Sequence, residues 1–164
     1  MTDIFKTAAV QASGLEAEHP LAAVLSARDD ILTMTQQAHD AALTPDDPGG
    51  LSHGERAALA CRMCRLNGED TLAAHFETLI TRDEPHEGIA DPAFDGGADD
   101  RLSAILRHTD LTTGDTKSVT GDDIAALADA GVSEDDIVRL SELIAFVNYQ
   151  VRLVTGLRLM EDLS

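Results

Sequence analysis

The chain has 164 residues, of which 30 are acidic and 12 basic, and its formal net charge is −18. Its length and its hydrophobic share of 43% predict one globular domain over residues 1–164. The acidic surplus argues against nucleic acid and anionic membranes as partners, because both require basic patches. No apolar run reaches the roughly 18 residues of a membrane span, and no signal peptide is visible, so we expect a cytoplasmic protein.

The composition predicts an all-α fold with almost no strand. Alanine and leucine dominate, aromatic residues make up 3%, and runs alternating with period two are absent. Ser52, Thr120 and Ser133 each precede an acidic first turn, as N-caps do, while Gly68 and Gly131 are typical helix stops. We predict a short helical turn from Pro20 and helices over 3–13, 27–43, 52–66, 69–82, 99–113, 121–130 and 133–162.

Two segments are predicted to be loops. Residues 44–50 contain two prolines and two glycines and form a clear break between helices. Residues 83–97 are acidic and rich in glycine and proline, so we expect a mobile surface loop there. We interpret this segment as a loop inside one domain rather than a linker, because neither half alone would make a convincing core.

The last predicted helix carries two apolar stripes, each with spacings near three and four. A helix that packs on one core needs one stripe, so two stripes indicate burial on two sides. We therefore predict a homo-oligomer through helix 133–162, and a central helix wrapped by its own neighbours is the alternative. The first stripe is Ile137, Leu140, Ile144, Val147, Val151 and Val154, and the second is Leu143, Phe146, Leu153, Leu157 and Met160.

Two cysteines, Cys61 and Cys64, lie three residues apart, a spacing that raises the question of a redox pair. They fall in the second half of helix 52–66, where the dipole of the helix N-terminus cannot stabilise a thiolate. On a helical wheel they share an apolar face with Ala57 and Ala60. We favour packing over redox chemistry and expect both thiols to be buried and reduced.

His75 and Glu55 are candidates for proton transfer. His75 lies in the middle of helix 69–82, and the turn at residues 67–68 folds that helix back along helix 52–66. This hairpin would bring His75 towards residues 55–59. A Glu–His pair facing a thiol could form a proton relay, although a lone His on a partly apolar helix is more often a core residue.

Asn148 and Arg152 place polar groups on one face of the otherwise apolar last helix. Because buried polar groups must find partners, we favour helix–helix locking or an interface hydrogen bond over direct catalysis. Patterns for zinc, calcium or phosphate binding are absent from the sequence, so no metal and no bound cofactor is implied.

Residues 51–60, then 66–68 and 73–75, resemble the carboxymuconolactone decarboxylase domain of the alkylhydroperoxidase D-like superfamily. Residues 131–138 and 144–152 resemble the same domain, most of all its peroxidase-related branch. The resemblance covers roughly residues 45–162. It implies an AhpD-like helical bundle over 45–164, an extra N-terminal helical region over 1–44, and obligate homo-oligomers.

Active members of that family reduce organic hydroperoxides with a Cys-x-x-Cys pair assisted by Glu and His. The resemblance carries the two assisting roles onto Glu55 and His75, with a possible slip of one residue. In active members the His follows the second cysteine by four, and here that spacing gives Thr71. The cysteines of this chain lie one to two turns upstream, on the preceding helix.

Two functions follow from these observations. In the first, Cys61 or Cys64 attacks a hydroperoxide, the other cysteine resolves the sulfenic acid, and an external thiol reductant restores the pair. Glu55 and His75 move the protons. In the second, the protein is a non-peroxidatic member of the family. It would then be a structural or small-molecule-binding oligomer, or a lyase-like enzyme that uses Glu55 and His75 alone.

Overall fold

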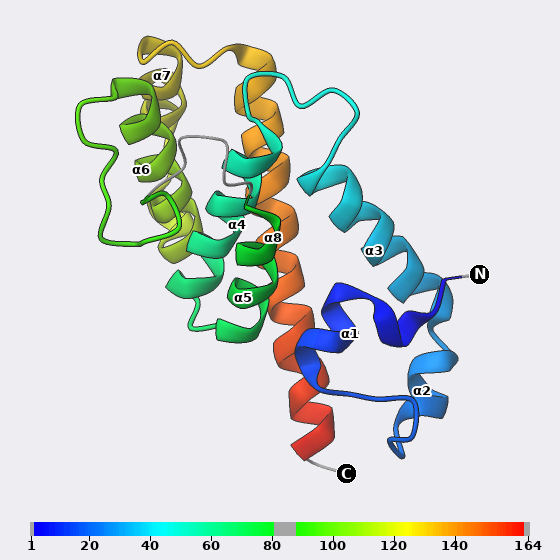
Figure 1. Ribbon diagram of the computed structural model, residues 1–164. Coiled ribbons are helices and arrows are strands. Elements are labelled where there is room, and N and C mark those ends of the chain that lie inside the picture. The colour runs from blue at the N-terminus through cyan, green and yellow to red at the C-terminus, as the bar shows by residue number, and fades with distance from the viewer. Residues whose placement is uncertain (1, 81–87, 163–164) are drawn as a thin grey trace.

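The computed structural model (Figure 1) describes residues 2–80 and 88–162, and within these ranges every regular element is a helix, as predicted. No helix of the described residues is long and apolar enough to cross a bilayer. The elements are η1 (Ile4–Lys6), α1 (Ala8–Ser13), α2 (Ala22–Ser26), α3 (Asp29–Leu43), α4 (His53–Leu66), α5 (Asp70–Leu79), α6 (Asp100–Gly114), η2 (Thr116–Ser118), α7 (Gly121–Asp129) and α8 (Glu134–Asp162).

The predicted N-caps and stops are confirmed. The hydroxyl of Ser52 accepts a hydrogen bond from the Glu55 amide, and the hydroxyl of Ser133 accepts one from the Asp136 amide. Thr120 forms a capping box at the start of α7. Gly68 and Gly131 follow α4 and α7 with φ of 69° and 85°, a region that disfavours residues with a Cβ.

Two predicted helices differ from the structure. The predicted helix 3–13 is broken at Thr7, whose backbone is extended and whose hydroxyl donates to the Ile4 carbonyl at 2.6 Å. This local bond competes with the helical pattern, so η1 and α1 are separate elements. The predicted helix 69–82 ends at Leu79 as α5, and residues 81–82 lie outside the described part of the chain.

Helix α8 is the central helix of the fold, and helices from both halves of the chain pack against it (Figure 1). Helices α4, α6 and α7 pack on its N-terminal part, and α1 and α3 on the rest. Helix α4 is buried all round, since every residue from Gly54 to Cys64 is buried. The sequence pattern placed the cysteines on one apolar face of this helix. The structure shows instead that α4 is buried on all its faces.

The predicted mobile loop is anchored over the part that the structure describes. Ile89 is buried, and the buried guanidinium of Arg62 bonds to the Asp110 carboxylate at 2.5 and 2.6 Å. Arg62 also donates to carbonyls along residues 88–97, so this side chain on α4 fixes the loop. Those carbonyls belong to Ile89, Asp91, Pro92 and Phe94. Residues 83–87 lie outside the described ranges.

The second apolar stripe of α8 is largely covered by the chain itself. Leu143 is 0% exposed, Leu157 is 6% exposed, and Phe146 and Leu153 are half-buried. The N-terminal residues make a small core of their own with the end of α8: Ile4, Val10, Leu15, Leu25, Leu32 and Leu157. The alternative of a helix wrapped by its own neighbours thus accounts for the stripe, and the oligomer stays a prediction.

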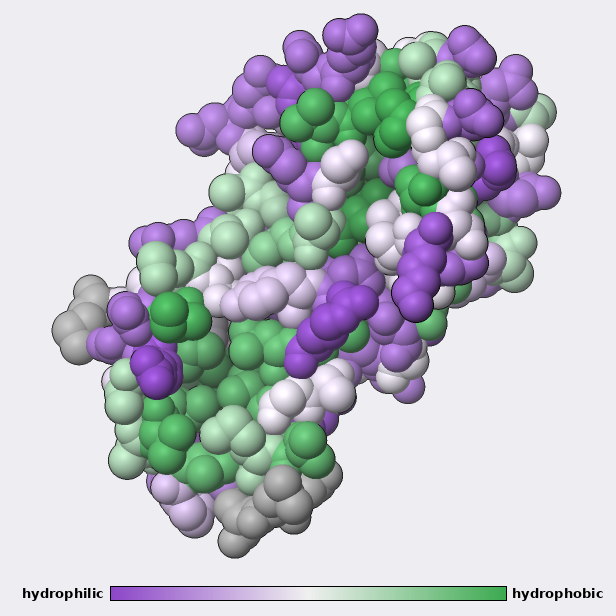
Figure 2. All heavy atoms as spheres, turned by 180° about the vertical axis from the view of Figure 1, so that it is seen from behind, coloured by the Kyte–Doolittle hydropathy of each residue, from purple (hydrophilic) through white to green (hydrophobic). Residues whose placement is uncertain are grey.

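Figure 2 shows the back of the molecule, where hydrophobic side chains gather in patches that hydrophilic ones interrupt. The large apolar side chains with the highest exposure come from α2, α3 and α8, and also from the end of α4 and from α7. They are Val24, Ile31, Met34, Leu66, Ile124, Val138, Tyr149, Leu159 and Met160. Three of these side chains, Ile31, Met34 and Tyr149, line one shallow hollow between α3 and α8, and the others come from further elements.

Candidate functional site

The two cysteines lie inside the core of α4, and the prediction that they are buried is confirmed. Both Cys61 and Cys64 are 0% exposed, and both are free thiols. Burial raises the pKa of Cys64, and the neighbouring Cys61 and Glu69 raise it further. Burial also raises the pKa of Cys61, against the opposing effect of Arg65. Since the thiolate is the reactive form, burial and the raised pKa values disfavour the form in which either cysteine would react.

Glu55 points away from the cysteines. At about 100° per residue, it lies about 120° from Cys61 and about 180° from Cys64 around the axis of α4. Its carboxylate accepts a hydrogen bond from Arg101 of α6 at 2.9 Å, and Arg101 also donates to the Gly50 carbonyl. Glu55 is therefore one half of an ion pair that joins α4 to α6.

His75 contacts His39, a residue that was not among the predicted site residues. Its Nε2 lies 3.1 Å from Nε2 of His39 on α3, and the His39 ring stacks on Phe76. Nδ1 of His39 lies 3.0 Å from an oxygen of Asp40. A proton on that Nδ1 leaves its Nε2 as the acceptor for His75. Burial lowers the pKa of His75, and His39 lowers it further.

The four predicted site residues thus engage different neighbours. Glu55 pairs with α6, the thiols are enclosed in the α4 core, and His75 bonds to α3. The predicted relay from Glu55 through His75 to a thiol has no hydrogen-bonded path in these contacts. Within residues 2–80 and 88–162, no three His, Cys, Asp or Glu side chains are grouped to hold a metal ion.

A different arrangement of polar groups lines a hollow between α6 and α8. It has a volume of about 330 Å³, within the usual range for small-molecule sites. Residues on one face of α8 form one wall of this hollow. The last turns of α6, together with η2, form the other wall. The lining residues are His108, Thr112, Thr116, Ser141, Ile144, Ala145, Asn148 and Arg152.

Asn148 fixes the floor of this hollow by joining three helices. Its Nδ2 donates to the Ile144 carbonyl at 3.0 Å and to Oγ1 of Thr113 on α6 at 3.3 Å. Its Oδ1 accepts from Nδ2 of Asn67, which follows α4, at 3.3 Å. The predicted helix–helix locking is confirmed for Asn148, whose side chain bonds to α6 and to the end of α4.

His108 is a buried imidazole whose hydrogen bonding is incomplete. It is 6% exposed, its Nε2 lies 3.5 Å from Oγ1 of Thr112, and its Nδ1 has no partner within the described chain. An unpartnered nitrogen is less costly without a proton, so the proton resides on Nε2. Burial lowers the pKa of His108, against the opposing effect of Asp123. His108 is therefore a neutral donor on the wall of the hollow.

Arg152 is the cation of this hollow. It is exposed, and its Nη1 donates to the Asn148 carbonyl at 2.8 Å, so the side chain turns back along α8 towards the other lining residues. Arg62 and Arg158 each hold a carboxylate with two nitrogens, whereas Arg152 pairs with none among the described residues. Its remaining donors are available to a ligand.

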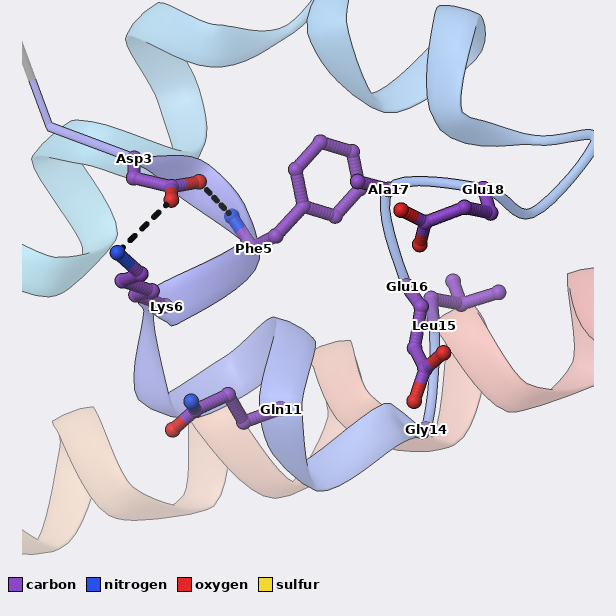
Figure 3. Close-up of a pocket in the computed structure, with 9 residues that line it drawn as sticks. All are labelled: Asp3, Phe5, Lys6, Gln11, Gly14, Leu15, Glu16, Ala17 and Glu18. Carbon is purple, nitrogen blue, oxygen red and sulfur yellow. Dashed lines mark hydrogen bonds and ion pairs between the residues drawn. The ribbon is translucent and has the colours of Figure 1, made fainter.

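A second hollow, of about 400 Å³, opens at the N-terminal region (Figure 3). The ring of Phe5 extends towards the segment of Glu16 to Glu18, and Asp3 holds the ammonium of Lys6 at 3.4 Å. The charged groups there are exposed side chains, and their cation is already paired. The hollow between α6 and α8 is the better candidate, because it contains buried polar side chains and an unpaired cation.

Comparison of the chain with protein-family models, with curated proteins and with solved structures gives no match. The resemblance to the carboxymuconolactone decarboxylase domain therefore stays a prediction. The fold and the site define an all-helical protein with a polar hollow between two helices.

The sequence contained part of the signal for this site, because Asn148 and Arg152 share one face of the last helix. Ser141, Ala145, Asn148 and Arg152 form a third stripe on the last helix, and it is more polar than the other two. The sequence alone could not place His108 beside this stripe, because their proximity depends on the packing of α6 against α8.

Proposed function

We propose that this protein binds a small molecule in the hollow between α6 and α8, and that it is not a thiol peroxidase. The observation that carries the proposal is that one hollow is lined by two polar side chains with incomplete bonding. One is the buried His108, and the other is Arg152, which has no carboxylate partner among the described residues. Native proteins satisfy nearly all their buried polar groups, and exceptions need an explanation. The N–H groups of Arg152 that do not bond to Asn148 need acceptors, and a ligand bound in the hollow supplies them.

The peroxidase alternative requires an accessible thiolate and a nearby proton relay. Both thiols are fully buried with raised pKa values, and Glu55 lies on another side of α4. An i,i+3 disulfide between Cys61 and Cys64 would also distort the regular helix that contains them, because disulfide geometry is narrow. These observations favour the non-peroxidatic alternative, in which no external thiol reductant takes part.

The homo-oligomer belongs to the same proposal. A shallow apolar trough of about 380 Å³ runs between α3 and α8, and its rim includes exposed Ile31, Met34 and Tyr149. This trough is the part of α8's surroundings best suited to a second copy, because apolar side chains dominate it. Light scattering at micromolar concentration tests the point, since a mass of 17.4 kDa means a monomer.

A fragment screen followed by NMR tests the binding proposal. The ¹⁵N-labelled protein is titrated with small acids, amines and neutral compounds, and the shifted amides are mapped. We expect at least one class of fragment to shift the amides of His108, Thr112, Ser141 and Asn148 together. The proposal fails if every fragment leaves these amides unmoved at millimolar concentration.

A matched pair of variants provides the control. Ala145→Trp places a large ring in the hollow from an exposed position on α8, so it should abolish the shifts without unfolding the protein. Ala74→Trp adds the same ring at an exposed position on α5, outside the lining residues, and should leave the shifts intact. Equal shifts in both variants would place the binding elsewhere.

A further inference from the structure

The polar groups of the hollow are unequally used. The hydroxyl of Ser141 donates to the Ile137 carbonyl at 2.8 Å, and that of Thr116 donates to the Thr112 carbonyl at 2.6 Å. Asn148 Nδ2 is already bonded to its neighbours. The donors left over are the remaining N–H groups of Arg152, while Nε2–H of His108 has only the long contact of 3.5 Å to Oγ1 of Thr112 and can still donate to a ligand. The hollow therefore offers donors and a positive charge to its ligand.

The acidic residues near the hollow do not cancel this charge. Asp123, which faces His108, pairs with Arg107 at 3.4 Å and accepts hydrogen bonds from Thr120. Glu142 lies on the other side of α8, where it lines a small cavity with Arg56 and other residues. More distant carboxylates are screened, because the Debye length is about 8 Å at physiological salt.

The remaining surface of the hollow is apolar. Ile144 and Ala145 lie one turn before Asn148 and line the same hollow. A ligand that fits both parts has a compact apolar body and one anionic, planar group that accepts from a guanidinium fork. A carboxylate has that geometry.

We propose that the ligand is a small organic acid, whose carboxylate binds Arg152 and His108 and whose apolar part packs against Ile144 and Ala145. This inference rests on the proposed function, because it names the chemistry of a ligand in the same hollow. A charge-assisted hydrogen bond stabilises a complex more than a neutral one does. The acid should therefore bind about tenfold more tightly than its uncharged isostere.

Benzoate and benzamide are the probes, since they share shape and differ in charge. Their dissociation constants are measured by NMR titration of the full chain at pH 7.5 and moderate salt. We expect benzoate to bind about tenfold more tightly than benzamide to the unmodified protein. In Arg152→Gln this advantage should fall below about threefold, while the spectrum outside the hollow stays that of the folded protein.

Arg28→Gln is the matched control. It removes the same charge from another exposed arginine without a carboxylate partner among the described residues, at the start of α3 and outside the hollow. We expect it to leave the preference for benzoate unchanged. An equal loss in both variants would overturn the inference, because the effect would then come from net charge.

The remaining outcomes separate this inference from the proposed function. If benzoate and benzamide shift the amides of the hollow with equal affinity, the hollow binds ligands but the carboxylate inference is wrong. If neither compound shifts them, and the wider fragment screen also fails, the proposed function falls together with the inference.

Discussion

Replacing Arg62 by methionine should destabilise the fold strongly. The guanidinium is 2% exposed and bonds to the Asp110 carboxylate and to carbonyls of the loop over residues 88–97. Removing one partner of a fully buried pair costs about 3–5 kcal/mol. The Asp110 side chain is 34% exposed, so water can hydrate the charge that remains. We therefore expect the lower end of that range, about 3 kcal/mol.

Urea unfolding at pH 7 measures this loss as a fall in the free energy of unfolding at constant m-value. The matched control is Arg107→Met, which breaks an ion pair whose arginine side chain is 69% exposed. That variant should cost less than about 1 kcal/mol, as surface pairs do. A loss below about 1 kcal/mol in Arg62→Met as well would refute the reasoning that this side chain anchors the loop.

Three further predictions follow from the burial of particular groups. In native buffer, Cys61 and Cys64 should not react with a bulky maleimide, and one equivalent of cumene hydroperoxide should leave the count of free thiols unchanged. Both thiols should react with the maleimide after denaturation. Rapid loss of two thiols in the native protein would support the peroxidase alternative instead. The folded state lowers the pKa of His75 below its ordinary 6.5, so the unfolded chain binds the proton first and stability should decrease as the pH falls below 6.5. The variant His75→Phe should show a weaker decrease between pH 7 and 5 in urea titrations, and an unchanged slope would count against the burial argument. Phe146→Asp should lower the free energy of unfolding by about 2–4 kcal/mol, because the ring packs against His39 inside the chain. If light scattering instead shows a folded species of lower mass than the unmodified protein, a subunit interface covers that ring.

Local patterns predicted the helices well because caps and periodicity are local properties. Ser52, Thr120 and Ser133 start helices where their hydroxyls can bond to a backbone amide three residues on. The break at Thr7 was missed, because a hydroxyl that bonds back to a carbonyl leaves no mark in the hydrophobic pattern. The role of residues 1–44 as cover for α8 was also missed, since no pattern in α8 indicates what lies against it.

The site was harder to predict because it depends on long-range packing. The sequence placed Glu55 and His75 on adjacent helices, but the partners that define them are Arg101 and His39, which lie 46 and 36 residues away. A Cys-x-x-Cys spacing in a helix is compatible with chemistry or with packing. The apolar face shared with Ala57 and Ala60 favoured packing, and the burial of α4 on all sides, which the sequence did not show, favours it further.

A crystal structure of the protein soaked in benzoate tests the central claim most directly. We expect the ring to lie between α6 and α8 against Ile144 and Ala145, with the carboxylate about 3 Å from nitrogens of Arg152 and His108. Benzoate bound only elsewhere, for instance in the hollow around Phe5, with the space between α6 and α8 holding no ligand, would contradict it.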